Sequence, residues 1–145
     1  MIRPRGINLV IGLGIFAAIA ITLYWLTWFT APQFIQARTP QAADYQIYVN
    51  FEQAFPLADA WLAIAALNGV IGLWKMRPWG FLSMLLAGSS AIFLGLMDLL
   101  YDLEHNMFMP FTAEAATELA IVVLLLVLGP LIITVLWRHR REFIR

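Results

Sequence analysis

The chain has 145 residues, of which 62% are hydrophobic and 12% are charged, and nine basic residues balance nine acidic ones. A soluble domain carries about 25% charged residues, so half of the expected charge is missing. The chain has no cysteine, which excludes disulfide exchange, thiolate catalysis and cysteine-ligated zinc or iron–sulfur sites.

Four apolar runs follow one another along the chain, at residues 7–29, 56–74, 79–101 and 115–137. Each is about as long as the roughly 20 residues that a helix needs to cross a ~30 Å hydrocarbon layer. The first run exceeds the hydrophobic region of a signal peptide and no A-x-A cleavage site follows it, so we expect it to be retained. The sequence predicts an all-α, integral membrane four-helix bundle that forms one domain over residues 1–145.

The first connection between spans, residues 30–55, is long for a helical hairpin. Thr39-Pro40 is a favourable helix start, with threonine as the N-cap and proline at the first position. An apolar residue then recurs every four positions, at Ile47, Phe51 and Phe55. We predict a short amphipathic helix in this loop, resting on the outer surface or capping the mouth of the bundle.

Charge placement predicts the orientation. Eight of the nine basic residues fall on one side of a four-span topology, and only Arg38 lies on the other. The eight are Arg3, Arg5, Lys75, Arg77, Arg138, Arg140, Arg141 and Arg145. By the positive-inside rule that side is the cytoplasm, so we expect a multi-pass protein of the cell membrane with both termini cytoplasmic. Eight of the nine acids fall on the outer side: Asp44, Glu52, Asp59, Asp98, Asp102, Glu104, Glu114 and Glu118.

Three of these acids, Asp59, Asp98 and Glu118, fall inside three different spans at similar depth. At 1.5 Å per residue they lie roughly 24 to 28 Å from the cytoplasmic ends of their helices. Ionisable groups within a span are costly and usually face the bundle interior or a wet cavity. Asp102 and His105 share one helix face with Asp98, so we predict that these five residues form a ligand- or proton-binding site. Alternatively, Asp59 and Glu118 are acids that suit the first turn of a helix.

Three chemistries suit this cluster. Oxygen ligands with one imidazole favour a divalent ion such as Mn²⁺, Ca²⁺ or Zn²⁺, with Asp98, Asp102, His105 and Glu118 as candidate ligands. Carboxyl groups held close together can instead share a proton or act as a general acid–base pair. A cationic or amphiphilic ligand can also be held between the acids and an aromatic rim of Tyr24, Trp25 and Trp61. Bis-histidine haem is not expected, because His105 and His139 lie on opposite sides of the membrane.

Three function classes remain open. The first is a protein that binds or transports a cation, proton or cationic ligand. The second is a membrane enzyme on a lipid-like substrate, since four spans with outer acids resemble the sterol-isomerase-like (EXPERA) architecture in shape; no residue role follows from that resemblance. The third is an accessory subunit of a larger membrane complex. We expect membrane lipids as partners, with a membrane protein or a second copy packing on small-residue helix faces, and no nucleic acid.

Asn68, mid-span, is expected to hydrogen-bond to another helix.

Overall fold

The computed structural model describes residues 4–31 and 42–144, except for the side chains of residues 42–44, 113 and 114. Arg38 and the Thr39-Pro40 helix start therefore lie outside the described residues. The elements are α1 (Arg5–Thr30), α2 (Ala42–Glu52), α3 (Pro56–Trp74), α4 (Pro78–Glu104), α5 (Ala113–Arg138) and the 3₁₀ turn η3 (Arg140–Glu142). The described chain contains helices and no strand.

Four helical segments are long and apolar enough to cross a membrane: Arg5–Thr30, Tyr45–Trp74, Pro78–Glu104 and Ala115–Arg138. Only 28, 33, 44 and 22% of the residues in their most apolar stretches are buried inside the protein. Such extensive outward apolar surface is unfavourable in water and suits a lipid surround. The predicted all-helical fold with four candidate membrane spans is therefore confirmed.

The turn between α3 and α4 is tight because the chain reverses within three residues. The backbone N–H of Arg77 donates to the carbonyl of Gly72 at 2.8 Å, and that of Met76 donates to Leu73 at 3.0 Å. Met76 has a φ of 49°. These two bonds and the left-handed residue form a Schellman motif, which satisfies carbonyls at the end of α3. The motif makes α3 and α4 antiparallel neighbours.

Close packing holds together the end of the molecule that carries both termini. We call it the basic end, because Arg5, Lys75, Arg77, Arg138 and Arg140 lie there. A Cβ added to Gly80 would lie 2.2 Å from the carbonyl carbon of Gly72, so α3 and α4 touch through their backbones. The rings of Phe81 and Phe143 stack with centroids 5.5 Å apart, which fastens the C-terminal turn to α4.

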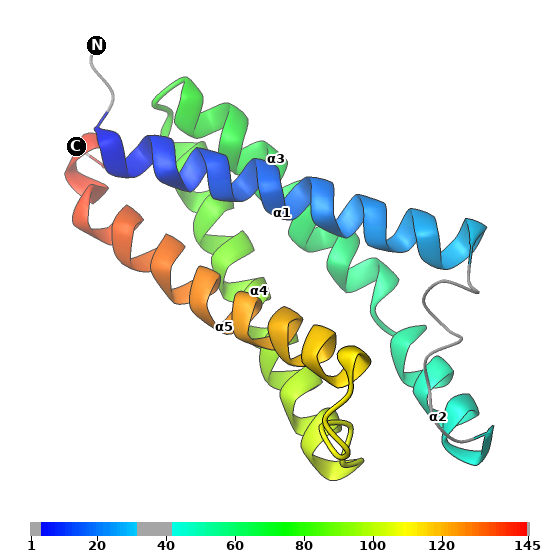
Figure 1. Ribbon diagram of the computed structural model, residues 1–145. Coiled ribbons are helices and arrows are strands. Elements are labelled where there is room, and N and C mark those ends of the chain that lie inside the picture. The colour runs from blue at the N-terminus through cyan, green and yellow to red at the C-terminus, as the bar shows by residue number, and fades with distance from the viewer. Residues whose placement is uncertain (1–3, 32–41, 145) are drawn as a thin grey trace.

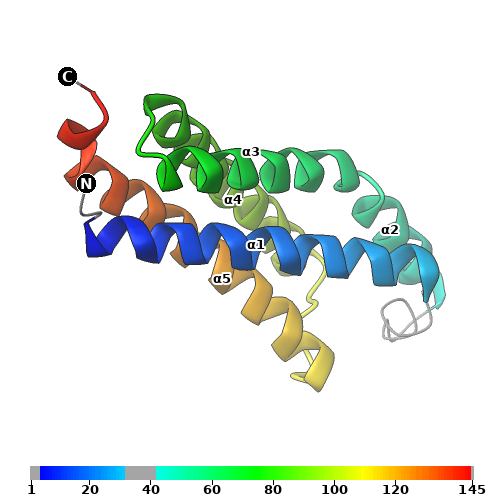
Figure 2. The same ribbon diagram turned by 90° about the horizontal axis from the view of Figure 1, so that it is seen from above.

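Helices α1 and α5 meet at the basic end and separate toward the other end. A Cβ added to Gly6 would lie 2.8 Å from Nε2 of His139, so the two helices are in contact there. Figures 1 and 2 show the first and last long helices diverging from that point in both views, with α3 running beside α1 and α4 beside α5. The side of the bundle between α1 and α5 is therefore its least closely packed side.

Helix α2 continues the direction of the chain into α3 after a short break at residues 53–55. Its inward side chains are Tyr48 and Val49, which are buried, whereas Ile47 is 51% exposed. The predicted stripe of Ile47, Phe51 and Phe55 is therefore wrong at its first member. The inward face of α2 instead carries Tyr48 and Glu52, which contact Trp28 and Tyr24 of α1, and Ile47 lies off that face.

Asn68 lies on the outward face of α3, next to the exposed residues Leu67 and Ile71. The buried face of the helix carries Ala65, Ala66 and Gly69 instead. The prediction that Asn68 bonds to another helix of this chain is therefore wrong.

Candidate functional site

A cavity of about 310 Å³ lies among the helices, and it is lined by carboxyl groups from four of them. These are Glu52 of α2, Asp59 of α3, Asp98 of α4 and Glu118 of α5. Each of the four is partly buried. No basic residue is among the described lining residues. The structure therefore brings Asp59, Asp98 and Glu118 to one cavity, as their matched depths in the sequence predict.

Helix α1 contributes no acid to the cavity but holds two of them in place. The indole Nε1 of Trp25 donates a hydrogen bond to Oδ2 of Asp59 at 2.8 Å. The hydroxyl of Tyr24 donates to Oε2 of Glu52 at 2.9 Å. The two aromatic rings pack edge to face, with centroids 5.2 Å apart and planes at 89°. Both hydrogen bonds join elements far apart in the sequence, so they fix α1 against α2 and α3.

The carboxyl groups lie close enough to interact with one another. Asp98 interacts electrostatically with Asp59 and Glu118, and Glu52 interacts with the same three acids. Like charges repel strongly where protein and lipid exclude water, because the effective dielectric constant is low. A bound cation or a shared proton relieves that repulsion. This electrostatic arrangement therefore favours a positively charged occupant.

Asp102 and His105 do not line the cavity. Asp102 is 6% exposed, and its Oδ2 has no hydrogen-bond partner among the described residues. His105 is exposed; its Nδ1 lies 2.9 Å from the carbonyl oxygen of Tyr101, and its ring stacks on that tyrosine at 4.1 Å. Helix α4 runs to Glu104, beyond the predicted boundary at residue 101. Asp102 and His105, the C-cap residue of α4, thus stand one and two turns beyond Asp98 and outside the cavity lining.

Of the three predicted rim residues, Tyr24 is the one that lines the cavity. Trp25 bonds to a lining acid. Trp61 does neither, and its side chain is 52% exposed. Side chains two positions apart on a helix point in directions about 200° apart. Trp61 therefore points away from the cavity when Asp59 points into it. Its place in the predicted rim is wrong.

The candidate metal ligands are not gathered at one point. Among the side chains that the structure describes, no three acids or histidines form a group that could hold a metal ion. Asp98 and Glu118 face the cavity, whereas Asp102 and His105 lie outside it. The described side chains therefore do not supply the several ligands within about 2.0–2.6 Å that a small ion such as Ca²⁺ or Mg²⁺ needs.

Glu52 belongs to the cavity although the sequence did not single it out. The signal was its spacing, because Glu52 precedes Asp59 by seven residues, which is about two helical turns. The predicted span begins at Pro56, which leaves Glu52 in the predicted connection at residues 30–55. The apolar helical stretch in fact extends from Tyr45 to Trp74.

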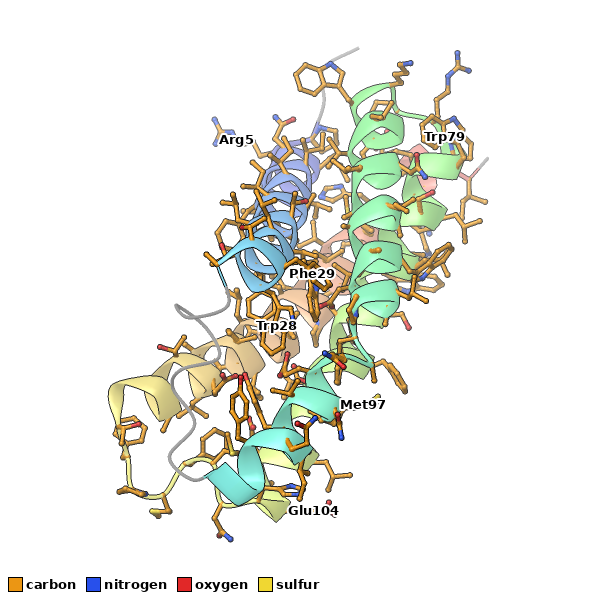
Figure 3. The ribbon with its side chains drawn as sticks, turned by 90° about the vertical axis from the view of Figure 1, so that its right-hand side faces the viewer. Arg5, Trp28, Phe29, Trp79, Met97 and Glu104 are labelled. Carbon is orange, nitrogen blue, oxygen red and sulfur yellow. The ribbon has the colours of Figure 1, made fainter. Side chains whose placement is uncertain are left out.

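Stacked aromatic side chains cover the acid-bearing end of the molecule, which we call the acidic end. Trp28 packs against Tyr48 with centroids 6.3 Å apart, and Figure 3 shows Trp28 between α1 and α2. Phe51 stacks on Tyr101 at 3.8 Å with planes 9° apart. Arg5 and Trp79 lie at the opposite end from Glu104 in the same view. Helix α2 is thus fastened over this end by aromatic contacts to both α1 and α4.

No protein-family model matches the chain, and neither a curated protein nor a solved structure is significantly similar to it. The class of the protein is therefore described from its fold and its cavity alone. It is an all-helical chain with four candidate membrane spans and a carboxyl-lined cavity at one end.

Proposed function

We propose that this protein binds an organic cation in the carboxyl-lined cavity. The observation that supports the proposal is the convergence of Glu52, Asp59, Asp98 and Glu118 on one cavity with no basic residue among its described lining. The volume of about 310 Å³ lies at the lower end of the range for small-molecule sites. The ring of Tyr24 adds an aromatic surface beside the acids, and such surfaces attract cations.

The proposal includes the orientation of the chain. The basic end faces the cytoplasm, because Lys and Arg are retained on that side of membranes. The acidic end then opens toward the outer side, and the site receives its ligand from there or from the outer leaflet. Binding is the step common to a receptor and a transporter for such a cation.

The test compares two small aromatic ions of similar size and opposite charge, phenyltrimethylammonium and benzenesulfonate. The purified full chain in a neutral maltoside detergent should bind the cation and not the anion, as measured by equilibrium dialysis. Asp98→Asn combined with Glu118→Gln should weaken cation binding by about tenfold or more, which corresponds to about 1.4 kcal/mol or more.

Glu104→Gln is the matched control, because Glu104 is an exposed acid of the same end that does not line the cavity. It should bind the cation as the unaltered protein does. Equal binding of the two ions, or equal loss in Glu104→Gln, would refute the proposal. Melting temperatures of all variants show whether each one is folded.

A further inference from the structure

The cavity continues well beyond the acids, into the apolar interior of the bundle. Apart from the four acids and Tyr24, every described lining residue is apolar, and the innermost positions are Gly14, Met84 and Ile132. Met84 precedes Asp98 by 14 residues, and Ile132 follows Glu118 by 14. At 1.5 Å per residue, both separations correspond to about 21 Å.

This length exceeds the depth of one membrane leaflet, so the cavity can hold a whole hydrocarbon chain. One leaflet contributes about half of the ~30 Å hydrocarbon layer, or roughly 15 Å. A volume of about 310 Å³ distributed over about 21 Å corresponds to a mean cross-section of about 15 Å², which describes a narrow channel rather than a wide chamber. A channel with a carboxyl-lined end and an apolar remainder has the polarity of an amphiphile with a positively charged head and one long chain.

The cavity also borders the lipid. Phe16 of α1 and Leu124 of α5 line it and are 49% and 39% exposed on the surface of the bundle. These are the two helices that diverge in Figures 1 and 2. A chain already dissolved in the bilayer can reach the cavity between them without crossing water. This geometry favours a membrane amphiphile over a small water-soluble amine.

The head group is restricted by the charge of the lining. A phosphodiester head would place its phosphate among Glu52, Asp59 and Asp98, and no described lining residue offers a compensating positive charge. Burying such a charge without a partner is strongly unfavourable. An ammonium group without a phosphate has no such conflict. Phospholipids and their single-chain derivatives are therefore poor occupants.

Resting on the proposed function, the geometry points to a long-chain amine as the ligand, with its ammonium group among the carboxyl groups and its chain along the apolar channel toward Met84. The channel passes Ala20, which lines the cavity one helical turn inward of Tyr24. A bulky side chain at this position blocks the route of the chain and leaves the carboxyl groups unchanged. Ile19, its neighbour in sequence, is 54% exposed and does not line the cavity.

The experiment offers the full chain an equimolar mixture of tetradecylamine, tetradecanol and tetradecylphosphocholine. Native mass spectrometry then counts the adducts that survive release from a neutral detergent. Tetradecylamine should form a one-to-one adduct at least tenfold more abundant than either of the others. Ala20→Phe should reduce that adduct at least tenfold, and Ile19→Phe should retain it.

The outcomes separate this inference from the proposed function. If phenyltrimethylammonium still binds but no tetradecylamine adduct forms, or if Ala20→Phe keeps the adduct, the long-chain ligand is refuted and the cation site stands. If the three tetradecyl compounds bind equally, the head-group assignment is refuted. If neither phenyltrimethylammonium nor tetradecylamine binds, both proposals fail.

Discussion

Replacing Gly80 with alanine tests the backbone contact that joins α3 to α4. The added Cβ would lie 2.2 Å from the carbonyl carbon of Gly72 and 2.4 Å from its Cα. Carbon atoms in contact normally lie about 3.5–4.0 Å apart. The two helices must therefore move apart by roughly 1 to 1.5 Å at this point. The blocking atoms belong to the main chain, so no side-chain rotation relieves the clash.

The expected loss of stability follows from that displacement. Overpacking a well-packed core costs about 1–3 kcal/mol, and an obstacle made of backbone places this substitution near the upper value. Alanine recovers up to about 1 kcal/mol because it is a better helix former than glycine. The net destabilisation is about 2 kcal/mol. For a chain of this size that lowers the melting temperature by roughly 4–8 °C.

The assay is thermal unfolding in neutral detergent, followed by tryptophan fluorescence. Gly12→Ala is the matched control, because a Cβ at Gly12 meets nothing within 4 Å. It should leave the melting temperature unchanged or raise it slightly, since only helix propensity changes. The double variant with Gly72→Ala should lose less than the sum of the single losses, because both clashes are relieved by one separation. Equal melting temperatures for Gly80→Ala and Gly12→Ala would refute the reasoning.

Three further predictions concern the site, the lipid-facing surface and the topology. Tyr24→Phe removes the hydrogen bond to Glu52 and should increase amide hydrogen exchange in α2, at a loss of about 1–2 kcal/mol; unchanged exchange there would contradict it. Asn68→Leu should leave the melting temperature in detergent unchanged or raised, because the amide faces outward; a drop of several degrees would show that it has a partner. In the cysteine-free chain, Glu104→Cys should react with a membrane-impermeant maleimide on intact cells, and Lys75→Cys only after lysis. The reverse labelling pattern would overturn the proposed orientation.

The membrane spans could be predicted because they depend on composition along the chain and not on contacts. The predicted range 56–74 is the range of α3, and α1 and α5 extend the predicted spans by only one or two residues at each end. Helix α4 ends at Glu104, three residues beyond the predicted span, because the apolar run from which the span is predicted ends before the helix does. A helix end held by a left-handed Asn106, with a φ of 53°, is not visible in hydropathy.

The depth of the site residues along their helices could be predicted from the sequence, but the direction in which each side chain points around its helix could not. Counting residues from the basic ends placed Asp59, Asp98 and Glu118 at one level, and the structure brings them to one cavity. Counting does not give the angle around each helix, and so Trp61 was assigned to the rim from its level alone. Glu52 was missed because its helix is separated from α3 by a break, across which periodicity was not extended.

The contact between Gly88 and Gly129 has a mechanical consequence. A Cβ at Gly129 would lie 2.7 Å from the carbonyl oxygen of Gly88, so α4 and α5 are pressed together there. Pro130, the next residue, has no N–H and weakens the helix at the same point. Glu118 lies 11 residues away, or about 16 Å along α5. Helix α5 can therefore tilt about its contact with Gly88. A tilt of about 10° at Gly129 displaces Glu118 by roughly 3 Å, so a small change at this contact produces a larger displacement at the acids.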